Sequence, residues 1–265
     1  MRDSLTASTL GAVFALPQGP RQLCLIVQYD GTDYHGFVKQ KKGPTIQGVL
    51  ESVLVEVMGK GRVVGASRTD SGVHAQGQVV VWDGQIPMPV DRVARALNGR
   101  LPKDIQIRGA GFVPLGWDPR RQATAKQYSY RIWRDALPPD LPWYRMVHVF
   151  RGPLVWSKLV EGAALFVGTH DFQAFRTEGS GVKTTVRTIR SSGWSMEEDG
   201  RLWRYQVVGD GFLYRMVRHM VGGMLQAAGA HGSLDVLKAG LSNPGCKVSW
   251  LAPAEGLTLD WINFG

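Results

Sequence analysis

The sequence predicts an α+β fold of two related halves, in which strands and helices are mixed along the whole chain. Segments rich in β-branched and aromatic residues alternate with segments whose apolar residues recur at helical spacing. Hydrophobic residues make up 44% and charged residues 20% of the 265 residues, which is typical of a globular protein with an ample core. Near GWDPRRQATAK the composition turns polar and basic, and we place the boundary between the halves at about residue 115.

The first half, residues 21–115, has roughly βαβαβ spacing. Its best-marked helix is TIQGVLESVLVEVMG, where Thr45 is the expected N-cap, an apolar stripe follows, and Gly59 is the expected stop. A shorter helix is expected in PVDRVARALNG, with Pro89 near its first turn. Residues 1–20 are expected to be a loose extension. The expected strands, in chain order, are RQLCLIVQYDG, QGQVVVW and IQIRGAGFV.

The second half, residues 116–265, restarts with the strand QYSYRIWRD. Its alternation places Tyr128 and Tyr130 on one face and Ser129 and Arg131 on the other. A helix is expected in SKLVEGAALFVG, with Ser157 as its N-cap. The remaining expected elements are strands in TIRSSGWSM and RLWRYQVVG joined by the turn EEDG, helices in FLYRMVRHMVGGMLQAAG and SLDVLKAGL, and a last strand in GLTLDWINF.

The charge balance bears on the kind of partner. The formal net charge is +9, with 31 Lys and Arg against 22 Asp and Glu. Such a balance favours polyanions, because phosphates gain from Lys and Arg contacts and release counterions on binding. Two basic, Gly-bearing segments, residues 38–44 and 176–185, are expected to be loops that suit contact with an extended anion. The alternative is that the charge serves solubility and that both loops are simply solvated.

Cysteine use and hydropathy indicate the compartment. Cys24 lies in the apolar run LCLIV and is expected to be a buried thiol, so Cys24 and Cys246 predict no disulfide framework and a reducing environment. No apolar run approaches the roughly 18 residues of a membrane span. The N-terminal residues lack a signal-peptide pattern, since an Asp directly follows the early Arg. We therefore expect a cytoplasmic protein with no membrane association.

Several chemistries find no support in the sequence. The six His residues form no HxxxH or HExxH pair and the two cysteines are far apart, so no metal site is expected. No GxGxxG follows a strand, no Walker loop is present, and no GxSxG elbow occurs. We therefore expect no metal and no cofactor.

The segment GASRTDSGVHAQGQVVVW, residues 65–82, carries the main candidate for catalysis. Asp70 in its Thr-Asp-Ser-Gly string could simply make an Asx-turn. However, Arg68 and His74 flank it on an expected surface turn, and nearby cations would keep its carboxylate ionised. An ionised carboxylate is a competent nucleophile, and the strand that follows would position it rigidly.

Residues of the second half supply possible partners. On a helical wheel of residues 212–228, Arg215, Arg218 and Gly222 lie opposite the apolar side. Two arginines beside the Gly222–Gly223 pair would let a phosphate or a carboxylate approach closely, although a solvated basic face is an equally good interpretation. Tyr128 begins a strand after a basic segment and could stack on a nucleobase, or could serve only as core packing.

These segments together resemble the TruA-type tRNA pseudouridine synthases. GASRTDSGVHAQGQVV is similar to that family's motif G-R-T-D-x-G-V-H-x-x-x-Q-V. A lone RTDSG would be weak support, but the similarity continues through nine blocks in the family's order, spanning about residues 22 to 262. The further blocks are YDGTDYHGF, TIQGVLE, ALNGRLPKDI, ATAKQYSYRIW, THDFQAFR, VRTI, GFLYRMVRHMVGGML and APAEGLTL.

The resemblance implies an isomerase that converts uridine to pseudouridine at positions 38, 39 or 40 of the tRNA anticodon stem-loop, without cofactor or metal. It implies that Asp70 is the catalytic nucleophile and that Arg68 helps to draw the target nucleotide out of the stack, a step that costs a few kcal/mol. It further implies that Tyr128 packs on the uracil and that Arg218 pairs with the catalytic carboxylate. The implied fold is two ferredoxin-like α+β subdomains with a cleft between their sheets, and the implied assembly is a homodimer with tRNA across both subunits.

The chain departs from the family pattern after the first strand. Relatives usually carry Y-x-G-W-Q there, whereas this chain has YHGFVKQKKG, with Phe37 in place of the Trp. This difference indicates an altered RNA contact at that segment. Two alternatives stay open: a non-catalytic RNA-binding or tRNA-folding module, and a pseudouridine synthase of another class that acts on ribosomal RNA.

Overall fold

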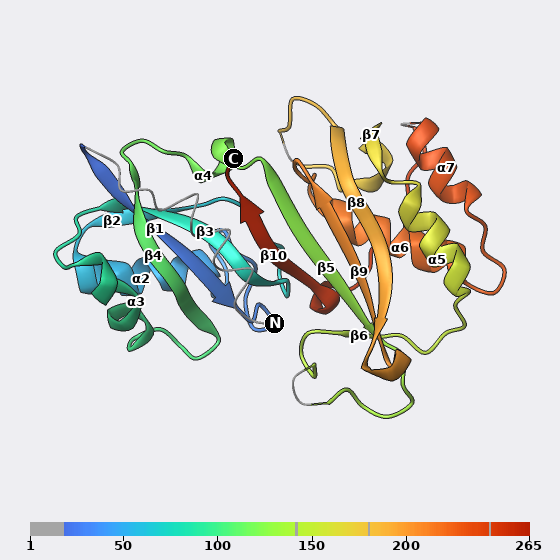
Figure 1. The fold of residues 1–265 in the computed structure, drawn as a ribbon, viewed down its shortest axis with the longest axis horizontal. Coiled ribbons are helices and arrows are strands. Elements are labelled where there is room, and N and C mark those ends of the chain that lie inside the picture. Colours follow the sequence, from blue (N-terminus) through green and yellow to red (C-terminus); the bar gives the residue numbers. More distant parts are fainter. Residues whose placement is uncertain (1–18, 141–142, 180, 244) are drawn as a thin grey trace. The chain divides into compact units, whose positions relative to one another are not determined.

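The computed structural model describes residues 19–140, 143–179, 181–243 and 245–265 (Figure 1). The chain forms two compact units, of which the first ends at Thr124 and resumes at Leu259–Gly265, while the second is Ala125–Thr258. The sequence suggested one boundary near residue 115. The division instead falls at the start of a strand, and the last strand of the chain belongs largely to the first unit. Residues 1–18 of the predicted extension lie outside the described residues.

The first unit is a sheet with helices packed on it. Its strands lie in the order β4-β1-β3-β10, with β2 paired to β3, and β1 is antiparallel to both β3 and β4. Helix α2 packs against β2, and α3 packs against β4. The elements are β1 (Arg21–Tyr29), α2 (Ile46–Met58), β2 (Gly61–Gly65), β3 (His74–Gly84), α3 (Val90–Asn98), β4 (Ile105–Pro114), α4 (Pro119–Gln122) and β10 (Leu257–Asn263).

Local signals explain the predicted helix α2 well. The Thr45 side chain accepts a hydrogen bond from the Gly48 N–H, as an N-cap should, and Gly59 ends the helix with a φ of 91° that favours glycine. The buried residues follow one stripe at intervals of four, and they are Ile46, Leu50, Leu54 and Met58. Propensity, caps and burial agree here, so this element matches its prediction.

The second unit is likewise a sheet with helices packed on it, and it completes the α+β class that the sequence predicts. Its strands lie in the order β5-β9-β8-β7; β9 is antiparallel to β5 and β8, whereas the short β6 pairs in parallel with β5. Helix α5 packs against β8 and α6, and α7 packs against α6. The elements are β5 (Ala125–Trp133), β6 (His148–Val149), α5 (Trp156–Ala164), β7 (Gly168–Asp171), η1 (Gln173–Phe175), β8 (Val186–Glu197), η2 (Glu198–Gly200), β9 (Leu202–Gly209), α6 (Met216–Ala228), α7 (Asp235–Ser242) and η3 (Ala254–Gly256).

Helix α6 differs from the predicted helix, which had an apolar face and an opposite basic face. It begins at Met216 rather than at residue 212, and Arg215 is its N-cap, with a φ of 62° in the left-handed region. Gly222 and Gly223 are buried, because the helix is enclosed on nearly all sides. A Cβ on Gly222 would lie 2.1 Å from the carbonyl oxygen of Trp250, so this glycine admits the protein's own backbone and not an outside anion.

One smaller expectation is also wrong. Helix α5 starts at Trp156, so Ser157 lies inside it, and its N-cap residue, Val155, makes no side-chain capping bond. Strand β5 is buried from Tyr128 to Trp133, so both of its predicted faces are covered by other parts of the protein. Arg131 is buried there because its guanidinium bonds to the Thr258 hydroxyl at 3.1 Å.

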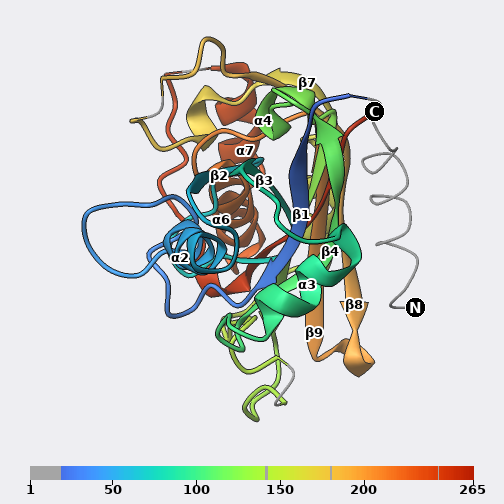
Figure 2. The same ribbon diagram turned by 90° about the vertical axis from the view of Figure 1, so that its left-hand side faces the viewer.

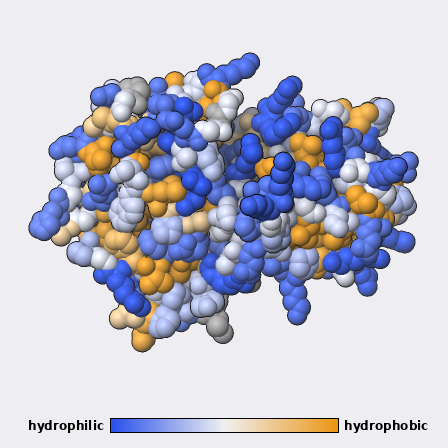
Figure 3. Space-filling view, turned by 180° about the vertical axis from the view of Figure 1, so that it is seen from behind, coloured by the Kyte–Doolittle hydropathy of each residue, from blue (hydrophilic) through white to orange (hydrophobic). Residues whose placement is uncertain are grey.

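The surface is mixed in character. On the face drawn in Figure 3, hydrophilic side chains cover most of the area, and hydrophobic ones form smaller separate patches. Within the described residues, no helix combines the length and the apolar character that crossing a membrane requires.

The two thiols should differ sharply in reactivity. Cys24 is completely buried in β1, and this burial raises the pKa of its thiol to about 12, whereas Cys246 is only partly buried. Because the thiolate is the reactive form, we expect one fast-reacting thiol in a native thiol titration and two in denaturant. Two fast-reacting thiols in the native protein would contradict this packing of β1.

Candidate catalytic-aspartate loop

The loop that carries Asp70, residues 66–73, connects the antiparallel strands β2 and β3 and is called the Asp70 loop here. The fully buried Gln78 side chain secures its start by two bonds to one residue. The Ser67 N–H donates to the Gln78 Oε1 at 3.1 Å, and the Gln78 Nε2 donates to the Ser67 carbonyl at 2.7 Å. The Gln78 amide thus satisfies the backbone donor and the backbone acceptor of Ser67, as a neighbouring strand would, and this fixes the direction in which the loop leaves β2.

The middle of the loop is fixed through Thr69, which is only 7% exposed. Its hydroxyl shares a 2.8 Å hydrogen bond with the Tyr29 hydroxyl at the end of β1. Its carbonyl accepts a 3.0 Å bond from the Phe37 N–H. Thr69 is therefore held on both its side chain and its backbone.

The far side of the loop is fixed through one carbonyl oxygen, that of Tyr34. The Ser71 hydroxyl donates to it at 3.1 Å and the Gly72 N–H at 3.3 Å. Within the loop, the Val73 N–H donates to the Asp70 carbonyl at 3.2 Å, which closes a turn. Gly72 has a φ of 78°, so the turn uses the conformational freedom of glycine.

The segment that holds the loop approaches it very closely. A Cβ on Gly36, whose φ is 86°, would lie 2.7 Å from the Thr69 carbonyl oxygen and 3.0 Å from the Asp70 carbonyl carbon. A side chain at this position would therefore push directly against the backbone that carries Asp70. Only glycine meets both the conformational and the steric requirement.

This frame leaves Asp70 and Arg68 on the accessible side. Arg68 is exposed and Asp70 is partly exposed, while Thr69 between them is buried. A carboxylate held this way changes position little, because Thr69 before it is hydrogen-bonded to Tyr29 of β1 and Ser71 after it to the Tyr34 carbonyl. The arrangement suits a nucleophile or a charge stabiliser that must meet a substrate in one orientation.

The ring of His74 faces a second carboxylate, that of Asp30. It is completely buried, and its Nδ1 lies 3.2 Å from the Asp30 Oδ1 and 3.1 Å from the Gly31 nitrogen. When Nδ1 carries a proton it donates to Asp30, and when it does not it accepts from the Gly31 N–H. In both forms the ring ties the start of β3 to the end of β1.

The pKa of the Asp30 carboxyl is strongly lowered by its neighbours. Partial burial alone would raise its pKa, but hydrogen bonds from His74 and Thr32 outweigh that effect and hold the pKa of Asp30 well below its usual range. The Thr32 N–H and hydroxyl donate to Asp30 at 2.9 and 2.6 Å. Asp30 therefore stays ionised and fixes the segment that leads to Gly36.

The second unit positions Tyr128 and Arg218. Tyr128 is 6% exposed near the start of β5, and its ring meets that of Phe212 edge to face at 5.1 Å. Arg218 lies in the first turn of α6, where its Nε donates to the Ala252 carbonyl at 2.8 Å and its own carbonyl accepts from the Ala252 N–H at 3.1 Å. This reciprocal pair sets the direction of the guanidinium.

Arg215 precedes the helix, and its guanidinium lies 4.8 Å from the Tyr214 ring centroid.

The four predicted residues thus divide equally between the units: Asp70 and Arg68 lie in the first, Tyr128 and Arg218 in the second. The sequence reasoning missed the residues that fix the loop, among which Gln78 and Tyr34 matter most. Both stand in segments already quoted, HAQGQVV and YDGTDYHGF. A polar residue inside a strand of Val residues was the available signal for Gln78, because a buried amide needs partners. Among the described residues, no group of three or more His, Cys, Asp or Glu could hold a metal ion.

Comparisons with known proteins point to one family. A family model described as "tRNA pseudouridine synthase" matches residues 25–120 and 163–264. The "tRNA pseudouridine synthase A" of Acetivibrio thermocellus is 39% identical over 241 residues, covering 90% of this chain and 98% of that protein. That of Geotalea daltonii is 40% identical over 245 residues, covering 90% and 98%. A chain of the "Crystal Structure of a Cbf5-Nop10-Gar1 Complex" is a distant neighbour, with 14% identity, a TM-score of 0.37, and coverage of 77% of this chain and 45% of that chain.

Gly36→Ala should disturb the Asp70 loop beyond the ordinary cost of a left-handed residue. The matched control is Gly116→Ala, since Gly116 has a φ of 82° and no atom within 4 Å of its Cβ position. We expect the control to lose about 1 kcal/mol of unfolding free energy and Gly36→Ala to lose a further ~1–3 kcal/mol from the clash. Urea denaturation measures both. Equal losses would show that the close approach to Thr69 has no energetic weight.

The Asp30 network predicts a specific pH dependence. Because the folded-state pKa of Asp30 is depressed, its contribution to stability is full above the unfolded value of about 3.9 and is lost as the pH falls toward the folded value. The difference in unfolding free energy between wild type and Asp30→Asn should therefore be largest near neutral pH and shrink below about pH 4. Asp91→Asn, at an exposed position in the first turn of α3, should lose no more than about 1 kcal/mol at any pH. A pH-independent difference for Asp30→Asn would contradict the depressed pKa of the Asp30 carboxyl.

Proposed function

The chain belongs to the tRNA pseudouridine synthase family, and from this premise we propose that it converts uridine to pseudouridine at positions 38, 39 or 40 of the tRNA anticodon stem-loop. The observation that carries the proposal is the Asp70 loop. It presents a partly exposed carboxylate from a hydrogen-bonded frame, inside the R-T-D motif that led to the family. The family match covers both units.

Asp70 is the proposed nucleophile. The reaction breaks the bond between the uracil N1 and the ribose C1′, rotates the base, and joins C1′ to C5, which then loses its proton while N1 gains one. Atoms and electrons balance within the nucleotide, so the step is an isomerisation that needs no oxidant or reductant. A carboxylate serves here as a temporary covalent partner, whether it adds first to the base or to the sugar.

The other three residues prepare the nucleotide. Arg68 is exposed beside Asp70, and its proposed role is to help draw the uridine out of the stack and to contact a phosphate. Tyr128 is the proposed packing surface for the uracil, and its edge-to-face contact with Phe212 would keep the ring in one orientation. Arg218 is the proposed partner of the Asp70 carboxylate, with its guanidinium directed by the bond to Ala252.

The net positive charge and the family support the proposed substrate and the proposed assembly. The net charge of +9 suits a phosphate-rich ligand, and recognition of several adjacent positions fits a reading of RNA shape rather than of base sequence. We extend the proposal to a cytoplasmic homodimer with tRNA contacting both subunits.

The decisive experiment replaces Asp70 with Asn and maps pseudouridine by position in unmodified tRNA transcripts. Loss of the nucleophile should lower the rate by at least about a thousandfold, while tRNA binding persists because no cation is removed. Asp91→Asn, which removes an exposed carboxylate of the same unit, should behave as wild type.

Three outcomes would overturn the proposal in different ways. An active Asp70→Asn enzyme would remove the nucleophile assignment. Product formed only outside positions 38 to 40 would remove the substrate assignment. Wild-type protein that binds tRNA but forms no pseudouridine in any transcript would favour a non-catalytic RNA-binding module.

A further inference from the structure

The segment between β1 and α2 ends in a basic loop, residues 38–44, which contains Lys39, Lys41 and Lys42. Figure 2 shows this part of the chain as a wide blue excursion beside α2. No helix or strand forms within residues 38–44, as the sequence predicted. The loop nevertheless has a defined shape, because both of its ends are hydrogen-bonded.

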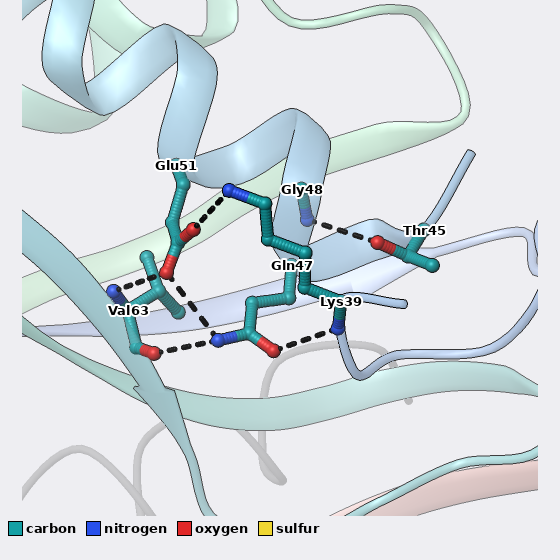
Figure 4. Close-up of polar contacts among 6 residues, drawn as sticks. All are labelled: Lys39, Thr45, Gln47, Gly48, Glu51 and Val63. Atoms are coloured by element: carbon teal, nitrogen blue, oxygen red, sulfur yellow. Dashed lines mark hydrogen bonds and ion pairs between the residues drawn. The ribbon is translucent and has the colours of Figure 1, made fainter. Parts of the chain in front are cut away.

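A polar latch holds the first end of the basic loop on α2 and β2 (Figure 4). The Lys39 N–H donates to the Gln47 Oε1 at 2.9 Å, and the Gln47 Nε2 donates to the Val63 carbonyl at 2.9 Å. Glu51 accepts the Val63 N–H at 3.0 Å with one oxygen and pairs with the Lys39 Nζ at 3.2 Å with the other. The Glu51 side chain is 15% exposed, so its pairing with Lys39 is partly shielded from water.

The second end closes back on His35. The His35 N–H donates to the Pro44 carbonyl at 2.8 Å, and the Gln40 side-chain amide donates to the His35 carbonyl. Gly43 has a φ of 74° and lies against the imidazole ring, where a Cβ would be 2.4 Å from the Cδ2. The basic loop is therefore compact, with its two ends close together, and surface loops of this kind are frequently functional.

The tip of the basic loop carries two ammonium groups, those of Lys41 and Lys42, that take no part in the latch. Lys41 and Lys42 are exposed, and within the described part of the chain neither ammonium forms an ion pair. Some other basic side chains of the same unit are paired with carboxylates, as in Arg62–Asp83, Arg100–Glu56 and Arg120–Asp118.

The basic loop and the Asp70 loop share one frame. His35, which closes the basic loop, is followed directly by Gly36 and Phe37, which contact the Asp70 loop at Thr69. The Gln47 N–H donates to the Phe37 carbonyl at 2.8 Å, so the latch helix also holds this segment. One short segment, residues 35–37, thus helps to hold both the basic loop and the loop that carries the candidate nucleophile.

We propose that Lys41 and Lys42 bind the RNA phosphate backbone close to the nucleotide presented to Asp70, with the Lys39–Gln47–Glu51 latch fixing them in place. Ammonium groups act as point charges and suit phosphates rather than base edges. Within residues 38–44 there is no aromatic side chain on which a base could stack. The inference rests on the proposed function for the identity of the RNA as tRNA.

The test compares Lys41→Gln/Lys42→Gln with Lys60→Gln/Lys103→Gln, a control that removes two exposed lysines from elsewhere in the same unit. Each lost phosphate contact should lower the slope of log K against log salt by about 0.7–0.9, so the loop variant should lose up to about 1.8 and the control none. KM for tRNA should rise in the loop variant while kcat is retained, since only binding is affected. Lys41→Arg/Lys42→Arg keeps both charges and should retain the wild-type slope.

The outcomes separate this inference from the proposed function. Equal slopes in the loop variant and the control overturn the lysine assignment even in an active enzyme. A wild-type protein that forms no pseudouridine contradicts the proposed function, while its salt slopes still test the lysines. A circular dichroism melt that matches wild type confirms that the exposed substitutions leave the fold intact.

Discussion

The close approach of the segment 31–37 to the Asp70 loop is the constraint on which the candidate site depends. At two points a side chain would collide with loop backbone: a Cβ on Gly31 would lie 2.0 Å from the Val73 carbonyl oxygen, and one on Gly36 would lie 2.7 Å from that of Thr69. Backbone packed on backbone leaves little room for movement. The main chain of segment 31–37, which follows β1, therefore helps to set the orientation of the carboxylate together with the hydrogen bonds of the loop itself.

How far the sequence predicts the fold depends on how local the determinants are. Helix α2 follows its prediction because Thr45, the apolar stripe and Gly59 act within one segment. The start of α6 does not follow its prediction, because the helix begins four residues later than the periodic pattern does. The Tyr214 carbonyl accepts a long-range bond from the Thr177 N–H, and Arg215 adopts a left-handed conformation. The unit boundary was likewise misplaced, since no local signal shows that Leu259–Gly265 joins the first unit.

The candidate site divides in the same way. A turn with Asp70 on its accessible side was predictable from the Gly- and Ser-rich string, since such residues shape turns. The partner of His74 was not, because Asp30 lies 44 residues earlier and the neighbouring Asp70 was the more obvious choice in the sequence. Asp70 and Arg68 come from one unit while Tyr128 and Arg218 come from the other, so only the family resemblance could group them.

The return of β10 to the first unit has a consequence for biosynthesis. Strand β10 is the neighbour of β3, but the ribosome makes it only after the whole of Ala125–Thr258. Until then part of one edge of β3 is open, because β2 pairs only with Val80–Gly84 and leaves the start of the strand uncovered on that side. During translation the second unit can therefore be completed before the unit that carries the candidate nucleophile.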